Sequence, residues 1–175
     1  MYRLREIERR DVSTINRWRN DEDLIGCLGA PFRYINPDVD AKWYEQYLSG
    51  RGSAVRCAIV GEDDLIIGMI SLVSIDNVNR SAELHIMIGD AANRHDGAGT
   101  FAVRTILRHA FRNLNLHRVE LSVLQTNDRA IRFYEKLGFS YEGTKRKARF
   151  KQGQYVDLLL YSMLESEYTE DRQPR

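Results

Sequence analysis

The chain has 175 residues, of which 43% are hydrophobic and 29% charged, with 26 Lys and Arg against 25 Asp and Glu. This composition is typical of a folded globular protein and excludes a disordered chain, while the balanced charge disfavours a nucleic-acid-binding protein. The length predicts one domain, residues 1–175, that buries about two-thirds of the surface of its unfolded chain.

Two cysteines, Cys27 and Cys57, lie far apart in the chain and show no metal-ligand spacing. We interpret both as reduced thiols packed as small buried hydrophobic residues, and we predict no metal site. The amino-terminal run MYRLREIERRDV alternates charged and apolar side chains, unlike a signal peptide, and no apolar run approaches the length of a membrane span. We therefore expect a cytoplasmic protein that has no membrane partner.

The beginning of the chain predicts a strand followed by a helix. Charged and apolar side chains alternate over residues 2–7, as in a half-buried strand. Asp11 is then placed to cap a helix whose apolar stripe ends at Trp18. Residues 21–36 lack periodicity and contain Gly and Pro, which predicts a loop or a short irregular helix.

A second helix and three strands are expected next. Asn36 supplies a helix cap and Pro37 a first-turn proline, and the helix is expected to end near Gly50. Its predicted inner side carries Val39, Trp43, Tyr44 and Tyr47. The strand candidates are residues 53–61, 65–76 and 81–90. Turn-like segments separate them, so they predict an antiparallel meander.

The second half of the chain alternates helices and strands. Residues 101–114 follow helical spacing and residues 117–124 form a buried strand, which implies parallel strands on either side of the helix. Asn127 can cap a short helix that Gly138 ends in a left-handed conformation. The last two strands are expected over residues 139–147 and 155–164, with a turn at 152–154 between them.

These elements follow the order βααβββαβαββ and cover nearly the whole chain. They predict an α/β (α+β) fold in which a single mixed, mostly antiparallel sheet of about seven strands is flanked by about four helices. The final strands could also pair between subunits and give a homo-oligomer.

A glycine-containing turn joins the strand candidate 81–90 to the helix candidate 101–114. Gly97 and Gly99 let the backbone approach a ligand closely, and the first N–H groups of the following helix lack intrahelical partners. This arrangement favours an anion such as a pyrophosphate. The turn lacks the Lys-Ser/Thr of a Walker loop and the third glycine of a dinucleotide fingerprint. A tight connection without a ligand is the alternative interpretation.

The spacing R-x-x-G-x-G in this turn resembles motif A of the GCN5-related N-acetyltransferase (GNAT) superfamily, whose backbone amides hold the pyrophosphate of acetyl-coenzyme A (acetyl-CoA). The resemblance implies that the coenzyme contacts Arg94, His95, Gly97, Ala98, Gly99 and Thr100. His95 and Asp96 depart from the common form of the motif, in which glycine and lysine are frequent. Because Asp96 would repel phosphate, we expect weaker coenzyme affinity, and the change Asp96→Lys should tighten it.

A second motif, TNDRAIRFYEKLGFSYEG, resembles the fourth-helix motif of the same superfamily. It matches N-x-x-A-x-x-x-Y-x-x-x-G-F at Asn127, Ala130, Tyr134, Gly138 and Phe139. With two motifs and the matching order of elements, the chain is identified as a member of the GNAT superfamily. The resemblance implies the GNAT fold and acetyl-CoA as co-substrate.

The second motif suggests roles for two side chains. A phenol at Tyr134 that reaches the thioester sulfur could protonate the departing thiolate, whereas a purely aromatic core residue is the alternative. The family's asparagine bonds the pantetheine region, which implies that role for Asn127, and a helix cap is the alternative. Both roles of the asparagine are compatible with each other.

The strand 81–90 has one polar face. The period of two places Glu83, His85 and Met87 on one side and Leu84, Ile86 and Ile88 on the other. A protonated amine must lose a proton before it attacks a carbonyl. We expect Glu83 to act as the base, and His85 is the second candidate. A salt-bridged Glu83 and a packed His85 are the alternatives. In the superfamily, backbone groups of this strand also pair with pantetheine, which implies contacts at Ile86, Met87 and Ile88.

The identity of the amine is less constrained. The final hairpin and the turn VNRSAEL most resemble ribosomal-protein N-terminal acetyltransferases and bacterial spermidine N-acetyltransferases, whereas the run RWRNDEDL is similar to amino-sugar N-acetyltransferases of nucleotide-sugar pathways. A polycationic substrate would need carboxylates, which Glu83 or the cluster 21–23 could supply, although such clusters are usually solvated. The basic run 145–151 could touch a phosphate, an acidic protein or RNA, or simply be a solvated strand.

The sequence therefore predicts a cytoplasmic acetyl-CoA-dependent N-acetyltransferase that acts on a small-molecule or peptide amine by direct transfer in a ternary complex. A protein N-terminal amine or a polyamine is favoured, and a nucleotide-linked amino sugar is the alternative substrate. A non-catalytic acyl-CoA-binding module is the alternative of another class. The amino acid at position 134 distinguishes these classes, because a binding module has no need of a tyrosine there.

Overall fold

The computed structural model describes residues 2–89 and 97–169 of the chain. In these residues seven strands form one sheet in the order β1-β2-β3-β4-β5-β7-β6. The strands are β1 (Arg3–Glu6), β2 (Val55–Val60), β3 (Ile66–Asp76), β4 (Ser81–Ile88), β5 (Arg118–Leu124), β6 (Ser140–Lys151) and β7 (Gln154–Leu164). Neighbouring strands are antiparallel except β4 and β5, which are parallel. The predicted mixed, mostly antiparallel sheet is confirmed.

Five α-helices lie within the described residues, where about four were expected. They are α1 (Val12–Arg19), α2 (Glu22–Gly26), α3 (Pro37–Ser49), α4 (Ala98–Arg108) and α5 (Asp128–Lys136). The additional helix is α2, in the segment expected to be a loop or a short irregular helix. It begins where the Asp21 carboxylate accepts a hydrogen bond from the Leu24 N–H at 3.0 Å. The element order is therefore βαααβββαβαββ.

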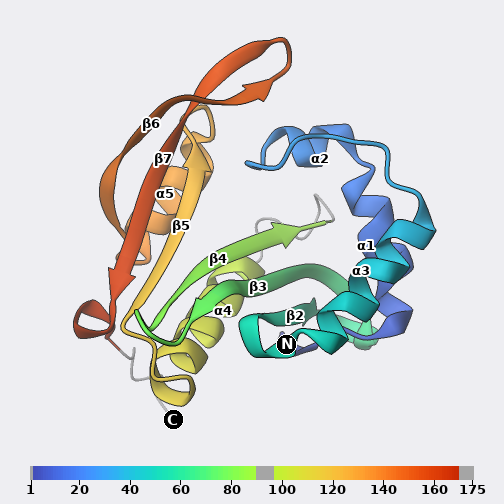
Figure 1. Ribbon diagram of the computed structural model, residues 1–175, viewed down its shortest axis with the longest axis horizontal. Coiled ribbons are helices and arrows are strands. Elements are labelled where there is room, and N and C mark those ends of the chain that lie inside the picture. The colour runs from blue at the N-terminus through green and yellow to red at the C-terminus, as the bar shows by residue number, and fades with distance from the viewer. Residues whose placement is uncertain (1, 90–96, 170–175) are drawn as a thin grey trace.

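The helices cover the two faces of the sheet separately (Figure 1). On one face, α4 and α5 pack over a core that includes Leu84, Ile106 and Phe139. On the other face, the segments α1 to α3 pack around a second core that includes Trp18 and Met87. Because β4 supplies Leu84 to one core and Met87 to the other, its predicted alternation is confirmed.

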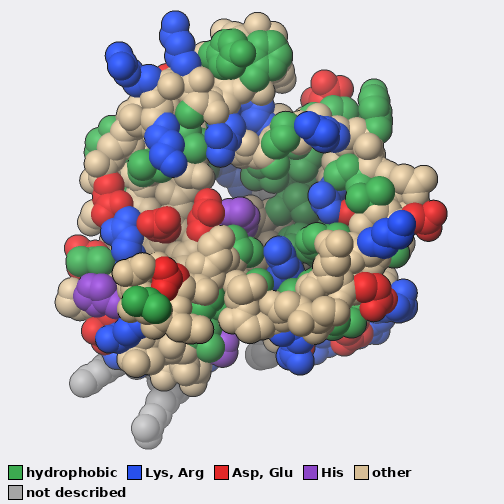
Figure 2. Space-filling view, in the orientation of Figure 1, with side chains coloured by type: hydrophobic (Ala, Val, Ile, Leu, Met, Phe, Trp, Pro, Cys, Tyr) green, Lys and Arg blue, Asp and Glu red, His purple; other side chains and the backbone are tan. Residues whose placement is uncertain are grey.

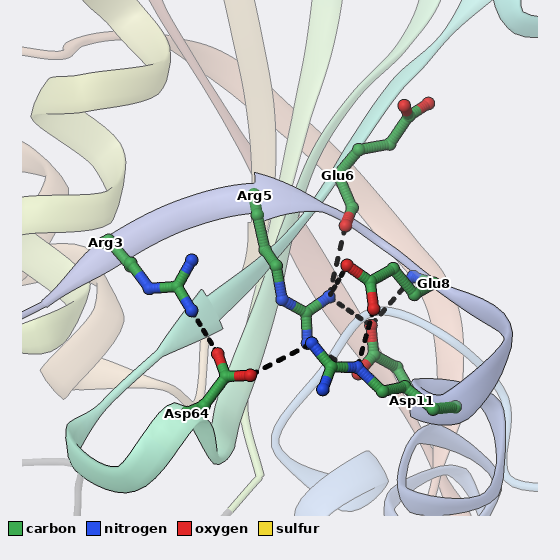
Figure 3. Close-up of polar contacts among 7 residues, drawn as sticks. Arg3, Arg5, Glu6, Glu8, Asp11 and Asp64 are labelled. Atoms are coloured by element: carbon green, nitrogen blue, oxygen red, sulfur yellow. Dashed lines mark hydrogen bonds and ion pairs between the residues drawn. The ribbon is translucent and has the colours of Figure 1, made fainter.

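The side chain of Asp11 does not cap α1, so this prediction was wrong. Its carboxylate instead pairs with the Arg5 guanidinium at 2.7 and 2.9 Å and accepts a hydrogen bond from the Glu8 N–H at 2.8 Å (Figure 3). Two parallel bonds to a charged donor are stronger than one bond to a neutral helix N–H. The side chain of Asp11 therefore binds Arg5 on β1 instead of the N–H groups at the start of α1.

The inner side of α3 is rotated from the predicted one. Val39 is exposed, although it was expected inside, and Asp40 is fully buried. Asp40 accepts a hydrogen bond from Asn16 Nδ2 at 2.7 Å and forms an ion pair with Arg19 of α1. A buried carboxylate must be paired, so the polar contacts between α1 and α3 fix the rotation of α3. Tyr47 remains buried as predicted.

The last two strands form a hairpin that is longer than expected. β6 continues past its expected end at Lys147 as far as Lys151. Gln152 and Gly153 have φ values of 46° and 83°, so the turn is left-handed at both central positions. Such a turn matches the twist of the paired strands.

Both cysteines are free, but only one is shielded. The expectation that both are buried is wrong for Cys27, which is exposed on the loop that follows α2. Cys57 in β2 is partly buried, and burial raises the pKa of its thiol to about 11. Within the described ranges, no helix is long and apolar enough to cross a membrane.

Candidate active site

A cleft of about 680 Å³ lies between the inner strands of the sheet and the loop that follows α2. Its walls include residues of β2, β3, β4 and β5, of α5, and of the β6 strand near its tip. Figure 2 shows the molecule hollowed near the middle of the viewed face, with hydrophobic side chains deep inside and basic side chains around the rim. The cleft joins segments that are far apart in the sequence.

The cleft exists because β4 and β5 diverge. The two strands pair only from Ser81 opposite Arg118 to Glu83 opposite Glu120, although β4 continues to Ile88. Beyond this point β5 remains paired with β7 as far as Leu124. The edge of β4 after Glu83 therefore has no β5 partner, and an extended ligand could add to it like a strand.

Two of the three predicted pantetheine contacts on this edge reach the cleft. Ile86 and Met87 line it, whereas Ile88 does not and packs instead toward the core under α4. Ile88 lies on the same face of the strand as Ile86 but two residues further along, at the end of β4. Its backbone groups still belong to the same edge.

Glu83 and His85 form a pair on the wall of the cleft. The Nε2 atom of His85 lies 3.0 Å from Oε1 of Glu83, and both residues line the cleft. The hydrogen bond from His85 lowers the pKa of Glu83 and outweighs burial, which would raise it. Glu83 is therefore ionised at neutral pH. The predicted base candidates lie next to each other on one polar face.

Tyr134 of α5 lies at the base of the cleft. Its ring packs edge-on against Phe133 and Phe139, at centroid distances of 5.2 and 5.7 Å. Burial raises the pKa of the Tyr134 phenol above its ordinary value of 10.0, so the phenol stays protonated. Its hydroxyl forms no hydrogen bond to the residues that the structure describes. The residue combines a core position with a proton donor available to a ligand.

Asn127 uses both ends of its side-chain amide. Its oxygen accepts a hydrogen bond from the Ala130 N–H at 3.0 Å, so the predicted cap of α5 is confirmed. Its nitrogen donates to the carbonyl oxygen of Cys27 at 3.0 Å. Asn127 also lines the cleft. Its predicted contact with pantetheine stays a prediction.

The amino terminus of α4 lies beyond the end of β4. Gly97 has φ of +82° and precedes the first helical residue, Ala98, which is fully buried. A Cβ on Gly97 would meet no atom within 4 Å, so its conformation rather than crowding favours glycine there. Gly99 and Thr100 complete the first turn of the helix. The predicted contacts at Arg94 and His95, and the expected repulsion by Asp96, lie outside the described residues.

Two basic residues of the run 145–151 in β6 form hydrogen bonds with the loop over the cleft and with the end of α2. Arg149 Nε donates to the Gly29 carbonyl oxygen at 3.0 Å, and Lys151 Nζ donates to that of Ile25 at 2.9 Å. Lys151 also bonds the Ala30 carbonyl oxygen. These basic side chains therefore bind this chain's own backbone carbonyls.

Sequence reasoning missed an aromatic and cationic wall of the cleft. Arg56 of β2 lies over the rings of Trp43 and Tyr47 of α3, at 5.2 and 5.8 Å from their centroids. Arg19 lies 5.7 Å from the centroid of Trp43 and pairs with Asp40. The strand alternation of residues 55–60 places Arg56 inward and could have indicated it.

The acidic cluster proposed for a polycation does not reach the cleft. Asp21, Glu22 and Asp23 are exposed around the start of α2 and are absent from the cleft wall, and Asp21 is used as a helix cap. Glu83 is the lone carboxylate among the described residues that line the cleft. Within the described chain, no group of three or more His, Cys, Asp or Glu side chains could hold a metal ion.

Comparisons with known proteins agree with this geometry. The family model described as the acetyltransferase (GNAT) domain matches residues 2–140. The chain is 30% identical over 169 residues to a spermidine N(1)-acetyltransferase of Vibrio cholerae serotype O1, and the match covers 94% of each protein. It is 33% identical over 168 residues to YdaF of Bacillus subtilis, named as a candidate ribosomal N-acetyltransferase, with 95% of this chain and 86% of YdaF covered.

A solved structure is also similar over nearly the whole length. The crystal structure of spermidine N-acetyltransferase from Vibrio cholerae in complex with CoA and spermine superposes with a TM-score of 0.89 at 26% identity. The match covers 95% of this chain and 96% of that chain.

Proposed function

The chain belongs to the GNAT acetyltransferase family and is an acetyl-CoA-dependent N-acetyltransferase. We propose that it transfers the acetyl group directly to a primary amine while both substrates are bound. The observation that carries the proposal is the placement of a protonated phenol, Tyr134, and a carboxylate–imidazole pair, Glu83 and His85, in one cleft. A direct transfer needs a proton acceptor and a proton donor in the same site.

The described residues fit the coenzyme in two places. The edge of β4 at Ile86 and Met87 lacks a β5 partner, so its backbone groups are free to pair with the extended pantetheine arm. The first turn of α4, from Gly97 to Thr100, offers backbone N–H groups and the positive end of a helix dipole to the pyrophosphate. When bound, acetyl-CoA supplies a thioester whose carbonyl carbon accepts the amine.

Glu83 and His85 prepare the amine. An amine is protonated at neutral pH and has no free electron pair until that proton leaves. Glu83 is ionised and can accept the proton, directly or through water, and His85 holds the carboxylate by the bond at 3.0 Å. Glu83 is therefore the proposed base and His85 its positioning partner.

Tyr134 completes the reaction at the sulfur. The bond between the acetyl carbon and sulfur breaks as the new bond to nitrogen forms, which leaves negative charge on the sulfur. The Tyr134 hydroxyl carries a proton that burial keeps in place and has no competing hydrogen bond among the described residues. It can donate this proton, or a hydrogen bond, to the leaving thiolate.

The acceptor classes come from the relatives and from the sequence. A spermidine acetyltransferase and a candidate ribosomal N-acetyltransferase support a polyamine or a protein N-terminal amine. We also propose a cytoplasmic location, which the two free cysteines support because thiols stay reduced there.

The test is release of the coenzyme thiol from acetyl-CoA in the presence of spermidine, of peptides that begin with Ser, Thr or Ala, and of a nucleotide-linked amino sugar. We expect release that depends on one amine class and that stops when the amine is omitted. Absence of release with every amine, while coenzyme binding is retained in calorimetry, would overturn the proposal in favour of a binding module.

A further inference from the structure

The charge of the cleft is opposite to what a polycationic acceptor needs. Among the residues that the structure describes, three guanidinium groups line it, those of Arg19, Arg56 and Arg149, against the single carboxylate of Glu83. Arg19 is compensated by the buried Asp40, and Arg149 donates to the backbone carbonyls of Gly29 and Ala148. Arg56 is therefore the guanidinium of this wall that has no acceptor among the described residues.

Arg56 is held in place but left without an acceptor. Its guanidinium lies over the rings of Trp43 and Tyr47, and its Nε is buried without a hydrogen-bond partner. Its side chain donates to none of the residues that the structure describes, and no described carboxylate pairs with it. Burial lowers its pKa, and together with the neighbouring Arg19 it outweighs the opposing effect of Tyr47.

The sheet places Arg56 in line with the proposed chemistry. In the register of the sheet, Arg56 of β2 is opposite Ser71 of β3, and Ser71 is opposite His85 of β4. All three residues line the cleft. Two strand spacings, about 10 Å, separate the backbone of Arg56 from that of His85. A single small molecule can therefore reach from the amine position beside Glu83 to the guanidinium of Arg56.

We propose that the amine acceptor carries a negatively charged group, a carboxylate or a phosphate, and that Arg56 binds it. This inference rests on the proposed function, because it names the acceptor of the same cleft, and it disfavours the polyamine among the acceptor classes proposed above. A planar guanidinium offers paired N–H donors that match either anion, and rings stacked on it restrict its motion before binding. A polyamine would instead add positive charge beside Arg56 and Arg19, the two guanidinium groups that lie over Trp43.

The test compares acceptors of equal length and different charge. Aminohexanoate carries a carboxylate at the end opposite its amine, aminohexanamide a neutral amide and diaminohexane a second cation. Aminohexyl phosphate adds a phosphate to this series, and a nucleotide-linked amino sugar is tested beside it as a longer phosphate-bearing acceptor. We expect kcat/KM to be highest for the anionic acceptor, lower for the neutral one and lowest for the cationic one. The anionic and neutral acceptors should differ by about tenfold or more. The better anion identifies carboxylate or phosphate as the natural group.

The variant Arg56→Gln links the preference to this residue. It should lower kcat/KM for the preferred anion by about tenfold or more and leave that for aminohexanamide within about twofold. Arg56→Lys, which keeps the charge, should recover part of the loss and serves if the glutamine variant does not fold. Arg9→Gln is the matched control, because Arg9 also lies over a ring, that of Tyr44 at 5.8 Å, but is outside the cleft. It should leave the order unchanged.

Binding of the same acceptors to the CoA-loaded protein, measured by calorimetry, separates this inference from the proposed function. The protein could bind anionic acceptors preferentially, lose this preference in Arg56→Gln and yet turn over no amine. That result would support the anion site and refute the transfer reaction. Two results would overturn the anion site and leave the transferase assignment intact. One is turnover in which diaminohexane is the preferred acceptor. The other is an Arg56→Gln enzyme in which kcat/KM falls equally for all acceptors.

Discussion

The side-chain nitrogen of Asn127 donates a hydrogen bond to the carbonyl oxygen of Cys27 at 3.0 Å, across 100 positions of the sequence. The same side chain caps α5 through Ala130, so one amide joins the helix that carries Tyr134 to the loop that covers the cleft. The β6 residues Arg149 and Lys151 also donate to backbone carbonyls of that loop, those of Gly29 and Ala30. The cover of the cleft is therefore held by two segments that are remote from it in sequence.

Replacing Asn127 by Asp separates its two contacts. Aspartate keeps an oxygen for the Ala130 N–H and remains a good helix cap, but it has no donor for the Cys27 carbonyl. We expect faster amide hydrogen exchange over residues 27–31 and a several-fold higher KM, with little change in the free energy of unfolding. Exchange mass spectrometry and steady-state kinetics measure these effects.

Asn127→Ala is the comparison, because alanine loses both contacts. It should be destabilised by about 1 kcal/mol more than the aspartate variant, the usual cost of a lost helix cap. If the aspartate variant retains wild-type exchange over residues 27–31, the bond to Cys27 does not hold the loop.

The phenol of Tyr134 gives the second prediction. Tyr134→Phe keeps the ring that packs against Phe133 and Phe139 but removes the hydroxyl. We expect kcat to fall by about 100-fold, as for loss of a general acid, while the Kd for CoA and the melting temperature stay nearly unchanged. Single-turnover kinetics measure the rate, and titration and scanning calorimetry measure the Kd and the melting temperature.

Tyr141→Phe is the matched control for this variant. Tyr141 is an exposed tyrosine of β6 that does not line the cleft, and its hydroxyl bonds Thr144 at 2.7 Å. It should leave kcat unchanged. A Tyr134→Phe enzyme with wild-type kcat would show that the residue serves only in packing.

The parts of the fold that were predictable depend on local signals. The alternation of β4 placed Glu83 and His85 on one face because side-chain direction in a strand has a period of two. Asn127 at a helix start and Gly138 at its end acted through neighbours a few residues away, and both behave as predicted. Such contacts are encoded within a few positions of the sequence.

The parts that were missed depend on contacts between remote segments. The alternation of residues 55–60 places Arg56 inward, but its local sequence does not specify its register with Ser71 or the rings on another helix that it contacts. Asp11 pairs with the guanidinium of Arg5 on β1 and does not cap the nearby helix. In each case a partner distant in sequence offers a stronger interaction than the local one.

The pair on β4 predicts a pH effect. The hydrogen bond from His85 holds the pKa of Glu83 below its ordinary value of 4.5, so Glu83 is ionised at every pH above that value. In His85→Ala the bond is absent and burial remains, so the pKa of Glu83 should rise and the acid limb of kcat/KM should move to higher pH. Carbon NMR titration of the Glu83 carboxyl measures the pKa directly.

His117→Ala is the control for the histidine variant, because His117 is exposed and lies outside the cleft. The Glu83 titration should not move in it. Glu83→Gln should in addition lower kcat/KM by about 100-fold, as for loss of a general base. An unchanged Glu83 titration in His85→Ala would refute the proposed positioning role of His85.

The ion pair between Arg5 and Asp11 predicts how stability depends on pH. Burial alone would raise the pKa of Asp11, but the bonds from Arg5 and from the Glu8 N–H outweigh it and lower the pKa. The carboxylate therefore stabilises the folded state fully above its unfolded pKa of about 3.9, and this contribution is lost as the pH falls through the lower folded pKa. Asp11→Asn removes the contribution and leaves Arg5 with only its longer ion pair to Glu8, at 3.6 Å, among the described residues.

We expect Asp11→Asn to reduce the free energy of unfolding by about 3 kcal/mol at pH 7, the scale for a buried pair that loses one partner, and by less as the pH falls below about 4. Urea unfolding at a series of pH values measures the difference. Asp64→Asn is the control within the same cluster (Figure 3), because Asp64 binds the exposed Arg3 and Arg10 and should cost less than about 1 kcal/mol. Equal losses in the two variants, or a loss in Asp11→Asn that is independent of pH, would contradict the assignment of this stability to the buried carboxylate.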